Sequence, residues 1–141
     1  MAIFYTKTIT LYNRTVTGGV MGGETWFPTV FTDVRLLINK GANIAATSMN
    51  DADSAKLHIS RRNLPKPYLP PIEWQALTDT GKGENFTLTS GHDFFVEGDT
   101  SAETVKSEDF FSYMKGKYSN CYKITNADIY DLIPHFEIGG R

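Results

Sequence analysis

Three histidines are the side chains of this 141-residue chain best suited to metal binding or to proton transfer near neutral pH. His58, His92 and His135 lie far apart in the sequence, on separate predicted strands. Zinc sites usually combine histidine and cysteine ligands at short spacing, and no second histidine or cysteine stands near any of the three. The sequence therefore does not predict a metal site.

The stretch HDFFVEGD (92–99) holds a dense group of acid–base side chains. Side chains alternate between the two faces of a strand, so His92 and Asp93 are expected to point in opposite directions. We therefore interpret the polar residues of this stretch as exposed groups at the ends of a core strand.

Three further stretches match functional motifs only in part. NDADSA (50–55) is rich in carboxylates but lacks the turn glycine and the final glutamate of a calcium loop. TGKGEN (80–85) lacks the spacing of a phosphate-binding loop, and Arg61 and Arg62 are interpreted as solvated surface. No serine or cysteine nucleophile stands in a recognisable catalytic signature. We expect no catalytic residues, no cofactor and no enzymatic activity.

Composition predicts one domain over residues 1–141, because 40% hydrophobic residues in a chain of this length suffice for one core. The net charge of −2 gives no basic field for sequence-independent DNA binding. The single cysteine, Cys121, excludes a disulfide within the chain and is expected to be a small buried side chain. The N-terminus lacks signal-peptide features and no stretch has membrane-spanning length, so we expect a soluble cytoplasmic setting without a membrane partner.

Most of the chain is predicted to form strands, which must position any functional side chains. Alternating or strand-forming runs occupy 7–16, 24–41, 56–60, 92–99, 118–132 and 134–140, with a short pair predicted at 72–77 and 85–90. The proline-rich segment 61–74 is expected to run extended, and 100–118 is the one predicted helix. The expected fold class is mainly β: a small β-barrel or sandwich of about seven strands with one short helix and long loops.

The chain ends on YDLIPHFEIGGR (130–141), an unusually apolar run for a terminus. Leu132, Ile133, Phe136 and Ile138 have to be buried either in the chain's own core or against a neighbour.

The first forty residues place KTITLYNRT, a glycine-rich turn and GGETWFPTVFTDVRLLI in sequence. This order resembles the head-tail joining proteins of long-tailed bacteriophages, also called head-completion, adaptor or stopper proteins. In that family a strand of the type ITLYRR leads through a glycine turn with Glu and Trp into a strand ending DVR. FFVEGD and CYKITNADIYDLIPHFEIGGR are similar to the family's final strands, whereas residues 41–92 match poorly.

The resemblance implies a small β-barrel subunit that assembles into a homo-oligomeric ring in the virion neck. A portal or adaptor protein would lie above the ring, and a tail terminator or tail tube protein below it. The ring would extend the portal channel, help to retain packaged DNA without binding its sequence, and offer the tail a docking surface. Synthesis would take place in the cytoplasm of the bacterial host.

Two sets of contact residues follow from this resemblance. The terminal strand is expected either to close its own barrel or to augment a neighbouring subunit, with Phe136, Ile138 and Arg141 as contacts between subunits or rings. The long loop 41–55 is expected to reach the channel, where Met49, Asp51 and Asp53 are the candidate residues. Acidic residues in such a lining would keep DNA from adhering.

Two other classes remain open at this stage. The chain could be a tail-terminator, minor capsid or capsid-decorating protein, which would also be a β-rich assembly subunit. It could instead be a small monomeric ligand-binding module that uses Trp26, Trp74 and Tyr68 as a stacking surface.

Overall fold

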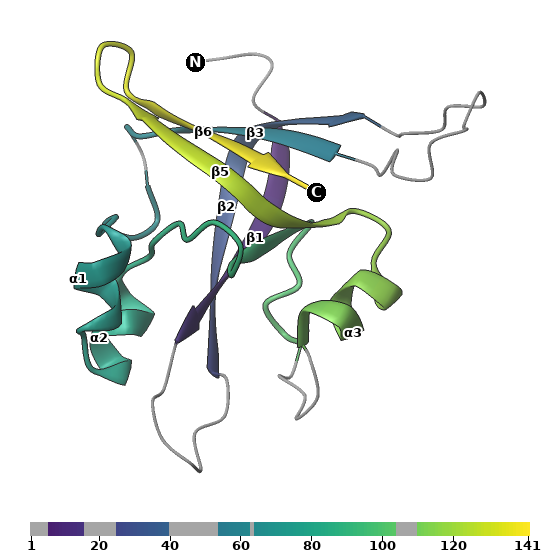
Figure 1. The fold of residues 1–141 in the computed structure, drawn as a ribbon. Coiled ribbons are helices and arrows are strands. Elements are labelled where there is room, and N and C mark those ends of the chain that lie inside the picture. Colours follow the sequence, from purple (N-terminus) through teal and green to yellow (C-terminus); the bar gives the residue numbers. More distant parts are fainter. Residues whose placement is uncertain (1–5, 16–24, 40–53, 63, 104–109) are drawn as a thin grey trace.

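The computed structural model describes residues 6–15, 25–39, 54–62, 64–103 and 110–141. Six antiparallel strands form a closed barrel in the order β1-β2-β3-β6-β5-β4 (Figure 1). Their bounds are β1 (Lys7–Thr15), β2 (Thr25–Asn39), β3 (Ser54–Ser60), β4 (Phe94–Glu97), β5 (Cys121–Tyr130) and β6 (His135–Gly140). The expected mainly β fold and small barrel are confirmed.

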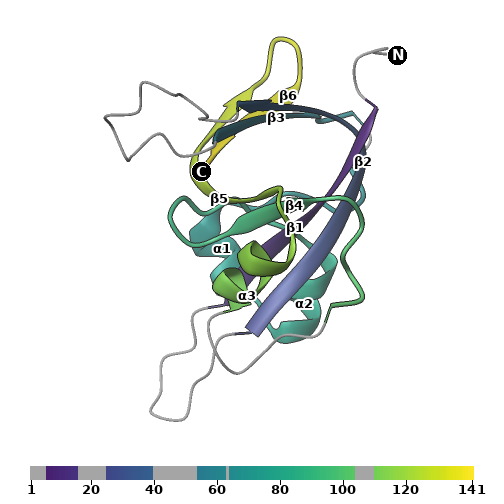
Figure 2. The ribbon, with the colours of Figure 1, turned by 90° about the vertical axis from the view of Figure 1, so that its right-hand side faces the viewer.

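Two long strands are bent so that each belongs to both halves of the barrel. β2 pairs with β1 up to Val34 and with β3 from Arg35 onward, and an irregularity at its centre places Asp33 at φ 56°. β5 pairs first with β4 and then, from Ile124 onward, with β6, across a register shift before Asn126. Bulges of this kind bend a strand and let it turn the corner between two sheets, as Figure 2 shows for β2.

β6 closes the barrel, because it pairs with β3 on one side and with β5 on the other. Its last residues are glycines because the neighbouring strands leave no room for side chains. A Cβ on Gly139 would stand 2.3 Å from the Asn126 side-chain oxygen, and one on Gly140 would stand 2.9 Å from the Tyr122 Cβ. Of the two arrangements expected for the terminal strand, the chain adopts closure of its own barrel.

Apolar side chains fill the barrel, and a second cluster lies outside it under helix α3 (Phe110–Lys117). The barrel core includes Ile9, Phe31, Leu57, Phe95, Phe136 and Ile138. The second cluster consists of Tyr12, Trp26, Phe94, Val96, Phe110, Met114 and Cys121. The burial expected for Cys121 is confirmed, since its side chain is fully enclosed.

Two short helices occupy the region for which an extended segment and a strand pair were predicted. α1 (Pro71–Gln75) begins with a proline in its first turn, where the missing backbone N–H is not needed. α2 (Asp79–Glu84) is capped by Thr78, whose hydroxyl accepts a hydrogen bond from the Gly81 N–H. The strand pair at 72–77 and 85–90 is therefore wrong, and the described residues contain three helices where one was expected.

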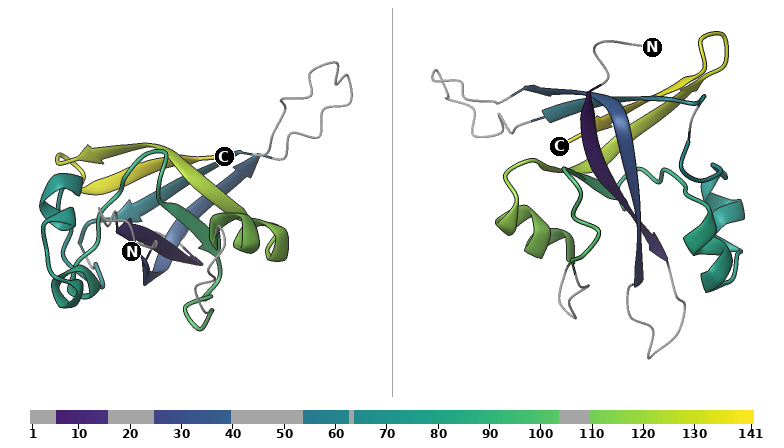
Figure 3. Two further views of the ribbon diagram at one scale, coloured as in Figure 1. Left: turned by 60° about the horizontal axis from the view of Figure 1, so that its bottom comes forward. Right: turned by 180° about the vertical axis from the view of Figure 1, so that it is seen from behind.

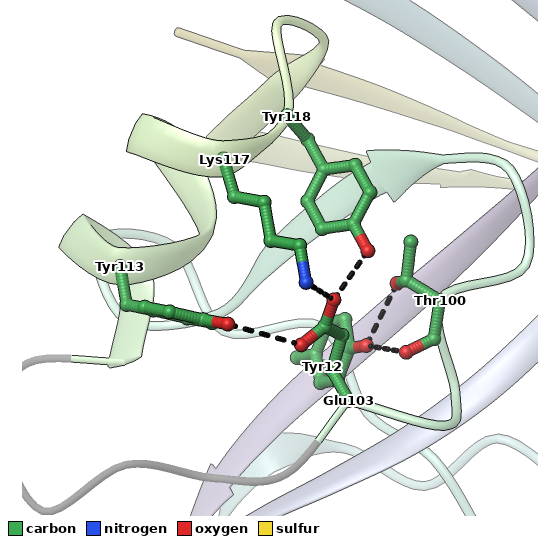
Figure 4. Close-up of polar contacts among 6 residues, drawn as sticks. All are labelled: Tyr12, Thr100, Glu103, Tyr113, Lys117 and Tyr118. Atoms are coloured by element: carbon green, nitrogen blue, oxygen red, sulfur yellow. Dashed lines mark hydrogen bonds and ion pairs between the residues drawn. The ribbon is translucent and has the colours of Figure 1, made fainter.

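The helices flank the lower part of the β1–β2 pair on opposite sides, with α1 and α2 on one side and α3 on the other (Figure 1 and Figure 3). Glu103 holds α3 in place: its carboxylate accepts hydrogen bonds from Tyr118 and Tyr113 and pairs at 2.7 Å with the Lys117 ammonium (Figure 4). Beneath it, the Tyr12 hydroxyl bonds to the Thr100 backbone oxygen at 2.7 Å, which ties β1 to the same segment.

A candidate docking site at the tip of the β5–β6 hairpin

The hairpin of β5 and β6 extends beyond the barrel (Figure 1). The turn at its end carries exposed apolar side chains. In that turn Leu132 is 96% exposed and Ile133 is 70% exposed, and Ile129 and Tyr130 at the end of β5 are each about half exposed. We call residues 129–133 the hairpin tip. Clustered exposed apolar side chains are typical of a surface that contacts another molecule.

Arg61, which follows β3, braces the hairpin tip from one side. Its backbone N–H donates to the Pro134 carbonyl at 3.0 Å. Its guanidinium donates to the Tyr130 carbonyl at 3.2 Å and forms an ion pair with Asp131. The same guanidinium lies over the Phe136 ring, 5.4 Å from its centre. The turn is thereby fixed to β3 as well as to its own two strands.

His135 braces the tip from inside the turn. Its Nδ1 lies 2.7 Å from the Ile133 carbonyl oxygen, its Nε2 lies 2.8 Å from a Glu137 carboxylate oxygen, and its ring stacks on Tyr130 at 4.7 Å. The Glu137 carboxylate, with the Ile133 carbonyl, raises the pKa of His135 above its ordinary value, and His135 in turn lowers the pKa of Glu137. A braced turn loses little conformational freedom when a partner binds, which favours docking.

The sequence-predicted contact residues lie elsewhere. Phe136 and Ile138 point into the barrel and are buried, so in the folded chain their side chains offer no exposed surface to a neighbouring subunit. Arg141 is exposed, and its backbone pairs with Lys123 through two 2.9 Å hydrogen bonds. The candidate channel residues Met49, Asp51 and Asp53 lie outside the described residues.

Two of the three aromatic residues named for a ligand-binding module, Trp26 and Trp74, are buried. Trp74 is fully buried, where its indole N–H donates to the carbonyls of Lys82 and Asn85, and Trp26 belongs to the cluster under α3. Tyr68 packs against Phe86 and Phe136. The two tryptophans are therefore not free to stack on a ligand, whereas Tyr68 is half-buried against the barrel core.

Asp93 is also placed differently from expectation. It was interpreted as an exposed strand-end group, but it is 1% exposed and accepts hydrogen bonds from the backbone N–H groups of Arg14 and Thr89 and from the side chain of Asn13. Its hydrogen bonds give Asp93 a structural role. It precedes β4, which pairs with the start of β5, whereas the hairpin tip lies at the other end of β5.

The family model for a family of unknown function, DUF6751, matches residues 4–141, which is nearly the whole chain. The chain belongs to this family. Neither the curated proteins nor the solved structures include a significant match. In this DUF6751 member, the described part of the chain has no helix that is long and apolar enough to cross a membrane.

Among the residues that the structure describes in this DUF6751 member, one group of three has the side chains and spacing to hold a metal ion: His58, His135 and Glu137. Sequence reasoning missed it because the two histidines are distant in the chain and meet only through the pairing of β3 with β6. The available signal was the spacing of His135 and Glu137, which puts both on one face of a strand.

Proposed function

We propose that this chain is a structural subunit of the bacteriophage neck, forming a ring between the head and the tail that docks on its neighbours through the hairpin tip. The observation that carries the proposal is the exposure of Leu132 and Ile133 on a braced turn. The likeness of both ends of the sequence to head-tail joining proteins supports the neck as the place of assembly. A small closed barrel is the fold that this likeness implies.

The tip contact would be weak for one subunit and strong for a ring. Burying one leucine or isoleucine side chain contributes about 1.5–3 kcal/mol, so Leu132 and Ile133 together contribute roughly 3–6 kcal/mol before the entropy of association is subtracted. Such a contact does not hold two free molecules together at low concentration. Repeated around a ring, however, the same contact acts many times at high effective concentration.

The charge of the chain suits a channel that DNA passes through. A net charge of −2 provides no general attraction for phosphates, so DNA would move through the ring without adhering to it. Met49, Asp51 and Asp53 remain the proposed channel residues in the loop 41–55. The portal or adaptor protein and the tail terminator or tail tube protein are the proposed neighbours, and the role requires no enzymatic activity.

Cryo-electron microscopy of the particles made by the genetic element that encodes this chain tests the proposal. We expect a ring of copies at the neck, with the hairpin tip against a neighbour. Density at the tail end or on the capsid lattice would overturn the neck position in favour of a tail-terminator or decorating role. Absence from the particles would overturn the assembly role altogether.

A double substitution, Leu132→Ser with Ile133→Ser, tests the tip itself. Both side chains are exposed, so the variant should keep the melting temperature of the unaltered chain while its occupancy at the neck falls. Ile72→Ser is the matched control, because Ile72 on α1 is 87% exposed and lies outside the hairpin. Equal occupancy of the double variant and the control would contradict docking through the tip.

A further inference from the structure

Two neighbouring strands bring two histidines and a glutamate together on the outer face of the barrel. β3 and β6 are antiparallel neighbours, with His58 directly opposite Glu137 (strands in Figure 2). His135 lies two residues before Glu137 and therefore on the same face. The inward neighbours Leu57 and Phe136 are buried, which confirms that the three polar side chains point outward.

The donor atoms of these three side chains are close enough to bind one ion. One atom from each of His58, His135 and Glu137 lies within 4.8 Å of the other two. The two imidazole rings are nearly parallel, with their centres 5.9 Å apart. The ligand atoms of a metal with bond lengths of about 2.0–2.2 Å lie closer to one another than 4.8 Å. A small rotation of these half-exposed side chains would bring the three donor atoms to that spacing.

The hydrogen bonding of His135 leaves the correct nitrogen for a metal. The Ile133 carbonyl, 2.7 Å from Nδ1, can only accept, so Nδ1 carries a hydrogen. Nε2 faces the Glu137 carboxylate at 2.8 Å and donates to it when protonated, so a metal ion binds at Nε2 by displacing that proton. An imidazole whose second nitrogen donates to a backbone carbonyl is the usual form of a metal-binding histidine, because that bond fixes the ring orientation and its tautomer.

We propose that His58, His135 and Glu137 bind a divalent transition-metal ion, with Zn²⁺ as the best match. Two imidazoles and one carboxylate suit zinc and neighbouring metals, whereas Mg²⁺ and Ca²⁺ require mainly oxygen ligands. Three protein ligands leave at least one position on the metal, which water or a donor group of an adjacent molecule fills. The ion joins β3 to β6, the seam at which the terminal strand closes the barrel.

The surrounding charges set a moderate affinity. Arg35 lies opposite His58 on β2 and Lys56 lies two residues away on the same face, and both are positive. Asp128 lies opposite Glu137 on β5 and offsets one of these charges. These three neighbours leave a net positive charge that opposes cation binding, so we expect an affinity of about micromolar order, weaker than that of a closed structural zinc site.

Titration of the untagged chain, after treatment with a chelator, tests the site. Isothermal calorimetry with ZnCl₂ should give one site per chain, and MgCl₂ should give none. At hundredfold excess over the dissociation constant, zinc should raise the melting temperature by about 5–10 °C. Co²⁺ in place of zinc should give visible absorption bands of a site with nitrogen and oxygen ligands.

Conservative substitutions assign the binding to these residues. His58→Gln and Glu137→Gln should each weaken zinc binding about tenfold or more and, at the same zinc concentration, reduce the thermal shift to about half or less. His92→Gln is the matched control, because His92 is an exposed histidine outside the group, and it should bind zinc as the unaltered chain does. No binding below millimolar zinc, or binding that survives both substitutions, would overturn the proposal. Both measurements use the isolated chain, so they give the same answer whether or not the neck role is correct.

Discussion

The Asp93 carboxylate accepts a 2.8 Å hydrogen bond from the side-chain amide of Asn13, a residue eighty positions earlier in the chain. The same carboxylate accepts from the backbone N–H of Arg14 at 3.0 Å and from that of Thr89 at 2.9 Å. Asn13 also donates to the Thr87 carbonyl at 2.6 Å. This buried group fastens β1 to the segment that leads into β4.

Asp93 should make stability depend on pH. Burial raises the pKa of Asp93 to about 6, against the opposing effect of its hydrogen bonds, whereas an unfolded aspartate titrates near 4. The folded chain therefore holds this proton more tightly, so the contribution is full below about pH 4 and is lost as the pH rises to about 6. This rise in pKa corresponds to a contribution of about 3 kcal/mol at most to the free energy of unfolding.

Asp93→Asn isolates this contribution. Asparagine has one acceptor oxygen for three donors, so the variant should be less stable by about 1–3 kcal/mol at pH 4.5. The deficit should shrink toward pH 7, because only the unaltered chain ionises. Urea unfolding at both pH values measures the two deficits, and a deficit that does not change with pH would contradict the titration of Asp93.

Gly140→Ala should destabilise the barrel. The new methyl group would meet the Tyr122 Cβ at 2.9 Å and the Phe95 ring at 3.0 Å, and overpacking of this kind costs about 1–3 kcal/mol. Gly116→Ala in α3 is the control, because no atom lies within 4 Å of its added carbon and alanine favours a helix. Denaturant unfolding should show the first variant weakened and the control unchanged or slightly stabilised.

Glu103→Gln should loosen α3 without unfolding the barrel. The substitution removes the charge that pairs with Lys117 and weakens the bonds from Tyr113 and Tyr118. Amide hydrogen exchange over Phe110–Lys117 should become faster, while exchange in β3 and β6 stays slow. The control Glu84→Gln, at the exposed end of α2, should leave exchange in α3 and in the strands unchanged. An unchanged exchange rate in α3 of the Glu103→Gln variant would show that the Glu103 carboxylate does not hold the helix.

Cys121 should not react with thiol reagents in the folded chain. Burial raises the pKa of this thiol from 9.0 to about 12, so at pH 8 its thiolate fraction is about a thousandfold lower than in the unfolded chain. The reaction of Cys121 with a chromogenic disulfide reagent, followed by absorbance, should be slow in buffer and rapid in urea. Rapid reaction without urea would show that the cluster under α3 opens readily.

The strands were predictable because their side chains alternate. Leu57 and Ile59 point inward on β3, and Phe136 and Ile138 do so on β6, which is the pattern that the sequence displays. α2 was not predictable from its own residues, because DTGKGE contains two glycines and no apolar stripe. It forms through contacts made elsewhere: the Trp74 indole of α1 donates to the Lys82 carbonyl.

The candidate sites depended on facts that are not local in the sequence. The sequence pattern shows that the terminal run is apolar, but it does not show where the hairpin turns. The position of the turn decides that Leu132 is exposed and Phe136 is buried. The pairing of His58 with Glu137 depends on a strand register between segments nearly eighty residues apart. A single sequence carries no direct signal for such a register.

The division of β2 and β5 between both halves of the barrel has a consequence for how the chain folds. Ile9 of β1 pairs with Glu97 of β4, and Ala55 of β3 pairs with Gly140 of β6. These ladders join segments that are distant in the sequence. High contact order of this kind slows folding to about milliseconds or seconds. Because each bent strand needs partners on both sides of its bulge, neither half is complete alone. The barrel should therefore form in a single cooperative transition with no stable half-folded intermediate.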